Sequence, residues 1–170
     1  MLCDFIVNNH HAYIRNQAPE IHLLAEKVSK VHGKEHPELI DIYHDFIELH
    51  EELLQHLHKE EEKLFPLIKA LDQQDLNITE AEITKLLEEL NEEHEDAGDE
   101  MKRIRLLTHN YQLPEDACQS YKMLYQELAE FEEDLYAHVH MENNILFPKF
   151  QQQLQQQLQQ LSTATESNYN

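Results

Sequence analysis

Hydrophobic residues recur along four stretches of the chain at alternating steps of three and four, the pattern of helices that bury one face. The predicted helices cover about residues 4–32, 37–71, 79–108 and 114–150. Their inward-facing positions are Val7, His11, Ile14, Ala18, Ile21, Ala25, Val28 and His32; Leu39, Ile42, Phe46, Leu49, Leu53, His56, Glu60, Leu64 and Leu67; Ile83, Leu87, Leu90, His94, Ala97, Met101 and Ile104; and Ala117, Tyr121, Leu124, Leu128, Phe131, Leu135, His138, Glu142 and Ile145. Short connections favour antiparallel neighbours. We therefore predict an all-α fold, an up-down-up-down antiparallel four-helix bundle.

A few residues mark the predicted helix ends. Gly33 closes the first helix, where a left-handed cap costs little. Thr79 is the predicted N-cap of the third helix, and Glu82 completes a capping box. Pro114 sits just inside the predicted start of the fourth helix. Gly98, within the third helix, either admits a close neighbouring helix or simply lowers stability.

The sequence changes character after residue 150. Residues 1–150 hold the four predicted helices, and residues 151–170 form a Gln-rich extension followed by a polar tail. Leu154, Leu158 and Leu161 keep helical spacing within the run QQQLQQQLQQL. We therefore expect one domain over residues 1–150, with the last helix continuing beyond it.

Charge and cysteine content narrow the class of protein. The 170 residues carry a formal net charge of −21, which disfavours nucleic acid and anionic membranes as partners and favours cations. No stretch approaches the roughly 20 apolar residues of a membrane span. Cys3 and Cys118 form no CxxC motif, and the N-terminal segment lacks the basic start and apolar run of a signal peptide. These features lead us to expect a cytoplasmic location.

Two segments repeat one motif, H-x-H-x-E followed by Phe-Pro. They are HLHKEEEKLFP, from His56, and HVHMENNILFP, from His138. Residues four apart share a helix face, so His56 with Glu60, and His138 with Glu142, each present an imidazole and a carboxylate to one point. Such nitrogen and oxygen ligands suit divalent iron, manganese or zinc.

Six polar residues interrupt the apolar stripes: His11, His56, Glu60, His94, His138 and Glu142. Burying unpaired imidazoles and carboxylates costs several kcal/mol, which a cation would offset. In an antiparallel bundle all six could meet in one layer. The set exceeds the four ligands of one zinc ion, and two ions bridged by the glutamates and by water, hydroxide or oxide use it better. Iron is the first choice and manganese the second. The alternative is a polar layer of satisfied His–Glu pairs that fixes the bundle register.

Other polar residues receive weaker assignments. Glu52 precedes His56 by four residues and Glu93 directly precedes His94, so both are candidates for outer support of the site or for a proton path. His32 lies about 30 Å along the helix from His11, so we expect a separate polar site or a satisfied core residue. The remaining histidines lie off the stripes and are interpreted as non-ligands: His10, His22, His36, His44, His50, His58, His109 and His140.

The motifs together resemble a known family. FIVNNHHAYIR, KVSKVHG, HEELLQHLHKEEEKLFP, EEHEDAG and HVHMENNILFP are similar to the hemerythrin-like domain of the iron-sulfur cluster repair di-iron proteins, also described as regulators of cell morphogenesis and nitric oxide signalling. The resemblance covers about residues 4–150. It implies a cytoplasmic non-haem di-iron centre, with the same six ligands and with Glu60 and Glu142 as bridges.

The resemblance also implies a role in oxidative and nitrosative stress. The expected function is to help restore damaged iron-sulfur clusters, by supplying iron or by reacting with nitric oxide at open iron positions. Many relatives carry an additional N-terminal domain with cysteines, and steps that need those thiols are not expected from this sequence. The alternative is a module that stores or senses oxygen or nitric oxide without repair. Oxygen-carrying hemerythrins, which the family resembles in fold, use more histidines and an H-x-x-x-H motif. The H-x-x-x-E motif found here therefore argues against stable oxygen carriage. Whether the protein is an enzyme, such as a nitric oxide reductase or peroxidase, stays open.

Overall fold

Four helical rods make up the computed structural model, which describes residues 1–73 and 79–167. The first rod joins α1 (Leu2–Ile6), the π-helical segment η1 (Val7–His11) and α2 (Ala12–His32); the second joins α3 (Glu38–Lys59), π-helical η2 (Glu60–Leu64) and α4 (Phe65–Asp72). The third is α5 (Glu80–Leu107); the fourth joins α6 (Gln119–Met141), π-helical η3 (Glu142–Leu146) and α7 (Phe147–Ser167).

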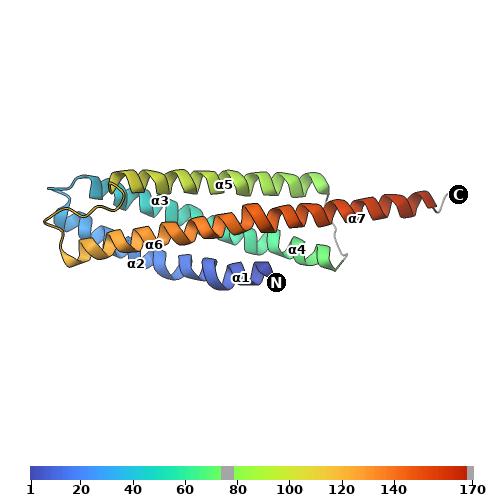
Figure 1. Cartoon of the computed structure of the whole chain (residues 1–170), viewed down its shortest axis with the longest axis horizontal. Helices are drawn as coiled ribbons and strands as arrows, with labels where there is room; N and C mark the ends of the chain where they lie inside the picture. Colours follow the sequence, from blue (N-terminus) through green and yellow to red (C-terminus); the bar gives the residue numbers. More distant parts are fainter. Residues whose placement is uncertain (74–78, 168–170) are drawn as a thin grey trace.

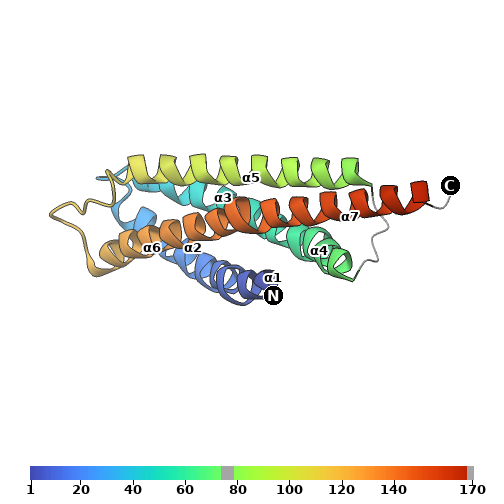
Figure 2. The same cartoon turned by 45° about the vertical axis from the view of Figure 1, so that its right-hand side comes forward.

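The rods run lengthwise beside one another and alternate in direction (Figures 1 and 2). α2 packs against α3 and α6, and α3 also packs against α5. The predicted all-α, up-down-up-down antiparallel four-helix bundle is therefore confirmed. α7 continues past the end of the bundle (Figure 1). The division of the chain at residue 150 stays a prediction. No helix of the described ranges is both long enough and apolar enough to cross a bilayer.

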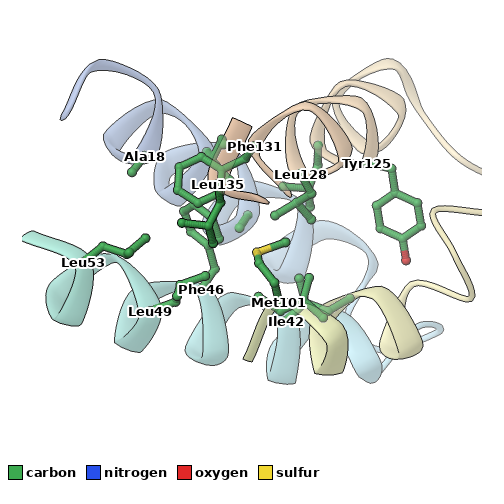
Figure 3. Packing of buried hydrophobic residues seen from close by; sticks show 14 of the residues in the cluster. Ala18, Ile42, Phe46, Leu49, Leu53, Met101, Tyr125, Leu128, Phe131 and Leu135 are labelled. Carbon is green, nitrogen blue, oxygen red and sulfur yellow. The ribbon is translucent and has the colours of Figure 1, made fainter. Parts of the chain in front are cut away.

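The core consists of two apolar clusters, one on either side of a polar layer. The first lies toward the α2–α3 and α5–α6 connections, where Phe46, Met101 and Phe131 point toward one another (Figure 3). The rings of Phe46 and Phe131 meet edge to face at 5.2 Å. The second cluster includes Ile6 and Phe150 near the N-terminal end. Burying each such side chain contributes about 1.5–3 kcal/mol, so the two clusters hold the polar layer between them.

The helix ends agree only partly with the predictions. The capping box is confirmed: Glu82 N donates to Thr79 Oγ1 at 3.3 Å, and Thr79 N donates to Glu82 Oε2 at 3.0 Å. A left-handed cap at Gly33 is wrong, because its φ is −63°. Left-handed residues occur instead at positions 109–111, inside the predicted turn. Residues 74–78 of the predicted connection lie outside the described residues.

The fourth rod begins later than predicted. α6 starts at Gln119, because its N-cap Cys118 is extended with ψ of 172°. Pro114 instead opens a turn, in which its carbonyl oxygen accepts a hydrogen bond from Ala117 N at 3.2 Å. Ala117 therefore sits in the connection and not on the predicted helix stripe. Contacts of the connection with the end of α2 hold it in place, since Cys118 Sγ lies 3.1 Å from His32 Nε2.

The three π-helical segments shift the buried stripe by one residue. A π turn closes its hydrogen bonds over five residues in place of four, so the next inward side chain arrives one position late. The predicted positions Val7, Leu67 and Ile145 are half-buried or exposed, and their neighbours Ile6, Ile68 and Leu146 are buried instead. The stripes are correct on the far side of each π segment, as Ile14, Leu53 and Leu135 illustrate.

Replacing Gly98 by alanine should stabilise the protein. A Cβ added at Gly98 would meet nothing within 4 Å, so this glycine admits no close neighbour and only lowers helix stability. We expect Gly98→Ala to raise the free energy of unfolding by about 1 kcal/mol, measured by urea denaturation. The control is Gly33→Ala, whose Cβ would lie 2.3 Å from the Ser29 carbonyl oxygen and should destabilise. An unfolding free energy that falls in Gly98→Ala would contradict the prediction.

Candidate metal centre

All four rods send polar side chains into one buried layer between the apolar clusters. The six predicted site residues gather there, and none is more than 5% exposed: His11, His56, Glu60, His94, His138 and Glu142. On the first rod, Ile6 lies before His11 and belongs to the second cluster, and Ile14 lies after it and belongs to the first. The layer is therefore enclosed by hydrocarbon along the length of the bundle, and little water can hydrate its charges.

Two overlapping groups of ligand atoms occupy the layer. One consists of His11, Glu60, His138 and Glu142; the other of His56, Glu60, His94 and Glu142. Within each group all the candidate ligand atoms lie within 4.8 Å of one another. Both groups share the same two carboxylates, so the arrangement offers two adjacent positions for cations with Glu60 and Glu142 between them.

Each carboxylate directs one oxygen toward each group. Glu142 Oε1 lies 3.0 Å from His138 Nε2, and Glu142 Oε2 lies 3.1 Å from His94 Nε2. Glu60 Oε1 lies 3.4 Å from His56 Nε2, and Glu60 Oε2 lies 3.3 Å from His11 Nε2. The i,i+4 pairs predicted from the repeated motif are thus formed, and each glutamate also reaches a histidine of another rod.

Hydrogen bonds satisfy this layer only in part, because the one that joins His56 Nε2 and His94 Nε2, 2.9 Å apart, involves neither carboxylate. Both carboxylate oxygens of Glu60 and Glu142, and Nε2 of His11 and His138, have no hydrogen-bond partner. Buried charged groups without partners cost several kcal/mol each. This observation weighs against a layer of satisfied His–Glu pairs, and the nitrogen and oxygen donors fit divalent cations of the first transition row.

Electrostatic coupling in the layer is strong. Burial alone would raise the pKa of Glu142, but the neighbouring His138 and the close imidazoles of His11 and His94 hold it well below its ordinary value. Burial alone would lower the pKa of His11, yet the carboxylates of Glu142 and Glu60 raise it to about 9. The pKa of His56 rises to about 10 for the same reason, with Glu60 as its main partner. Without a cation, protons on the imidazoles balance the carboxylates, so cation binding displaces protons.

Three of the four histidines are oriented by partners outside the layer. The imidazole Nδ1 donates a hydrogen bond from His11 to Glu61 at 2.7 Å, from His56 to Glu93 at 2.7 Å and from His94 to Asn143 at 2.8 Å. Each bond fixes the ring and leaves Nε2 directed into the layer. His138 differs, because its Nδ1 has no hydrogen-bond partner.

The outer residues were only partly anticipated. Glu93 does lie beside the candidate site, but it contacts His56 rather than the adjacent His94, and it also pairs with Lys59. Glu52 is exposed and borders a surface cavity of about 210 Å³ with His56 and Glu93. Glu61 and Asn143 were missed. The sequence does indicate both residues, since each directly follows the glutamate of one copy of the repeated motif.

The placement of His10 off the buried stripe is wrong, although neither group of candidate ligand atoms includes it. His10 is buried, donates from Nδ1 to Asp134 at 2.9 Å, and stacks on His138 with ring centroids 5.4 Å apart and planes 5° apart. The π turn of η1 explains the error, because it turns both His10 and His11 toward the interior. Stacking on His10 gives the His138 ring a neighbour where it lacks a hydrogen bond.

Removing the support of His56 should weaken cation binding. Glu93→Ala frees His56 Nδ1 and is expected to lower metal affinity about 10- to 100-fold. The measurement is competition for the metal against a chromophoric chelator. Glu92→Ala changes the exposed neighbour and serves as the matched control. Equal affinities in the two variants would rule out an orienting role for Glu93.

Comparisons with known proteins agree with the geometry. Residues 5–150 match the family described as the hemerythrin HHE cation binding domain. A probable iron-sulfur cluster repair protein of Haemophilus influenzae is 39% identical over 152 residues, 87% of this chain and 63% of that protein. The iron-sulfur cluster repair protein ScdA of Staphylococcus epidermidis is 35% identical over 149 residues, covering 87% and 65%.

A third relative, the iron-sulfur cluster repair protein YtfE of Yersinia pseudotuberculosis, is 36% identical over 148 residues, covering 87% of this chain and 64% of that protein. The chain thus spans 63–65% of the length of these curated relatives. The resemblance inferred from the motifs is confirmed. Since the family match extends over residues 5–150, the chain belongs to the hemerythrin HHE cation-binding domain family.

Proposed function

We propose that this chain holds two iron ions in the buried layer and acts in the cytoplasm to restore iron-sulfur clusters damaged by oxidative or nitrosative stress. His11 and His138 would bind one ion, His56 and His94 the other, and Glu60 and Glu142 would bridge them. An oxo or hydroxo group would complete the bridge. Manganese, which accepts the same donors, is the second choice of metal.

The observation that carries the proposal is the position of the two buried glutamates. Each has one oxygen near a histidine of each group, and none of the four oxygens has a hydrogen-bond partner. This arrangement gives each ion two nitrogen and two oxygen donors from the protein. An octahedral ion accepts six, so positions stay available for a small ligand such as nitric oxide or oxygen.

The bound ions would supply Lewis acidity and one-electron exchange. The protein's own contribution is to exclude water and to fix the histidines. Phe65 and Phe147, from the two Phe-Pro motifs, stack on His11 and His94 with ring centroids 5.7 and 5.9 Å apart. Both phenylalanines are buried, so they close the layer on the side of the second apolar cluster.

The names of the relatives support repair as the biological role. Two of the three relatives are described as iron-sulfur cluster repair proteins, and the third as a probable iron-sulfur cluster repair protein. We therefore propose iron-sulfur proteins as partners and either iron supply or nitric oxide chemistry as the means of repair.

The first test is metal content. Anaerobically purified protein should hold about two iron ions per chain, one for each group of ligand atoms. The double variant Glu60→Leu, Glu142→Leu should lose this iron, because it removes both bridging carboxylates. Elemental analysis and the absorption spectrum measure the result. Glu62→Leu, an exposed change within the same motif, is the control and should keep its iron.

The double variant should nevertheless fold. Replacing buried ionic groups by hydrocarbon of similar volume is often neutral or stabilising, so the metal-free variant should melt no lower than the metal-free parent. Thermal melting followed by circular dichroism checks this. Full iron retention by a folded double variant would overturn the proposed site.

The second test is repair itself. Iron-loaded protein should restore activity to an oxidised aconitase-type enzyme, whereas the folded double variant should not. Anaerobic activity recovery is the measurement, and free ferrous iron at equal concentration is the control. Reversible spectral change with oxygen or nitric oxide, without any recovery, would instead identify a gas-binding module and reject the repair function.

A further inference from the structure

A second group of metal-binding side chains lies at the far end of α2. His32 follows His11 by 21 residues, about 30 Å along the helix. Near it are His36 in the α2–α3 connection, and Asp116 and Cys118 in the α5–α6 connection. The proposed iron chemistry uses none of these four side chains.

The four residues form two close pairs on opposite connections. His32 Nε2 lies 3.1 Å from Cys118 Sγ, and His36 Nε2 lies 3.0 Å from both carboxylate oxygens of Asp116. The two imidazole centroids are 6.4 Å apart. Both rings pack on Tyr121, at 5.3 and 5.6 Å, so the pairs lie side by side on one aromatic surface.

The backbone fixes both connections. His36 N donates to the His32 carbonyl at 2.8 Å, which holds the two histidines one turn apart. Cys118 is the N-cap of α6, where backbone N–H groups stabilise a thiolate. His36 Nδ1 lies 3.4 Å from Glu38, an outer carboxylate that would accept a hydrogen bond from Nδ1 when a metal replaces the proton on Nε2.

These distances approach those of a tetrahedral zinc site. Zinc bonds of about 2.3 Å to sulfur and 2.0–2.2 Å to nitrogen or oxygen place neighbouring ligand atoms about 3.3–3.6 Å apart. Two imidazoles on one such ion have centroids about 5 Å apart. Unlike in the buried layer, no three of these four ligand atoms lie within 4.8 Å of one another. To share one ion, the two pairs would have to move toward each other, so that the imidazole centroids close from 6.4 Å to about 5 Å.

We propose that His32, His36, Asp116 and Cys118 form a peripheral zinc site that joins the α2–α3 connection to the α5–α6 connection. The H-x-x-x-H spacing of the histidines is typical of zinc ligands. Four protein ligands would close the coordination shell, as in structural rather than catalytic sites. A surface cavity of about 320 Å³ borders His36 and gives the ion access from solvent.

Cobalt provides a specific probe of this site. Cys3 and Cys118 are the two cysteines of the chain, and Cys3 is buried in the second apolar cluster. A thiolate-to-cobalt charge-transfer band on adding Co²⁺ to the iron-loaded protein would therefore report Cys118. We expect this band, with tetrahedral d–d absorption, at one ion per chain, and we expect zinc to displace the cobalt.

Matched variants separate the site from non-specific binding. Cys118→Ser and His36→Ala should each lower zinc affinity more than about tenfold, measured by chelator competition. Cys3→Ser and Glu115→Gln, which change the other cysteine and the carboxylate beside Asp116, should leave it unchanged. Zinc should also raise the melting temperature of the parent, but not of Cys118→Ser.

Three results would overturn the proposal. These are the absence of the sulfur–cobalt band, zinc affinity in Cys118→Ser equal to that of the parent, and alkylation of Cys118 by iodoacetamide at the same rate with and without zinc. The test is independent of the iron centre, because the buried layer contains no cysteine among its ligand groups. A protein that fails to load iron could still show the band.

Discussion

Two carboxylates without solvent exposure face each other at the centre of this bundle, and the rest of the structure accommodates them. Glu60 and Glu142 lie on different rods, and their oxygens are out of reach of backbone donors. Water cannot hydrate them, because apolar clusters close the layer at both ends. The four histidines therefore supply the partners that the backbone and solvent do not, and a pair of cations would take the place of the protons that those histidines otherwise hold.

The layer has an approximate internal symmetry. His56, Glu60, Glu61 and Phe65 on the second rod correspond to His138, Glu142, Asn143 and Phe147 on the fourth, each 82 residues later. Glu61 and Asn143 play equivalent parts, since each orients a histidine of another rod. The symmetry fails at one point: Glu93 supports His56, but its counterpart His10 stacks on His138 and leaves Nδ1 without a partner. The two cation positions are therefore not equivalent.

The sequence was sufficient to predict the fold and to choose the six residues of the layer. Hydrophobic residues repeat with the period of an α-helix, and polar residues that interrupt this repeat are easily recognised. The fold and the six residues of the layer could therefore both be predicted from local sequence pattern. The errors at Val7, Leu67 and Ile145 arose because the stripe was extended at 3.6 residues per turn through segments that are π-helical. Partners between rods, such as Glu61 with His11, depend on side-chain direction across the bundle, which periodicity does not give.

The π turns have a consequence for how the chain can change. On the fourth rod the buried positions His138, Glu142, Leu146, Phe150 and Leu154 follow one another at steps of four. In a regular α-helix each such step drifts by about 40°, and four steps would carry the stripe about 160° round the rod. The wider turn at η3 absorbs part of this drift. The polar residues His138 and Glu142 and the apolar residues that follow them therefore face the same side of the rod. Because a π turn holds one residue more than an α turn, loss of a single residue within η2 or η3 would let the segment close as regular α-helix, so these are the places where a rod can lose one residue without turning the helix beyond it.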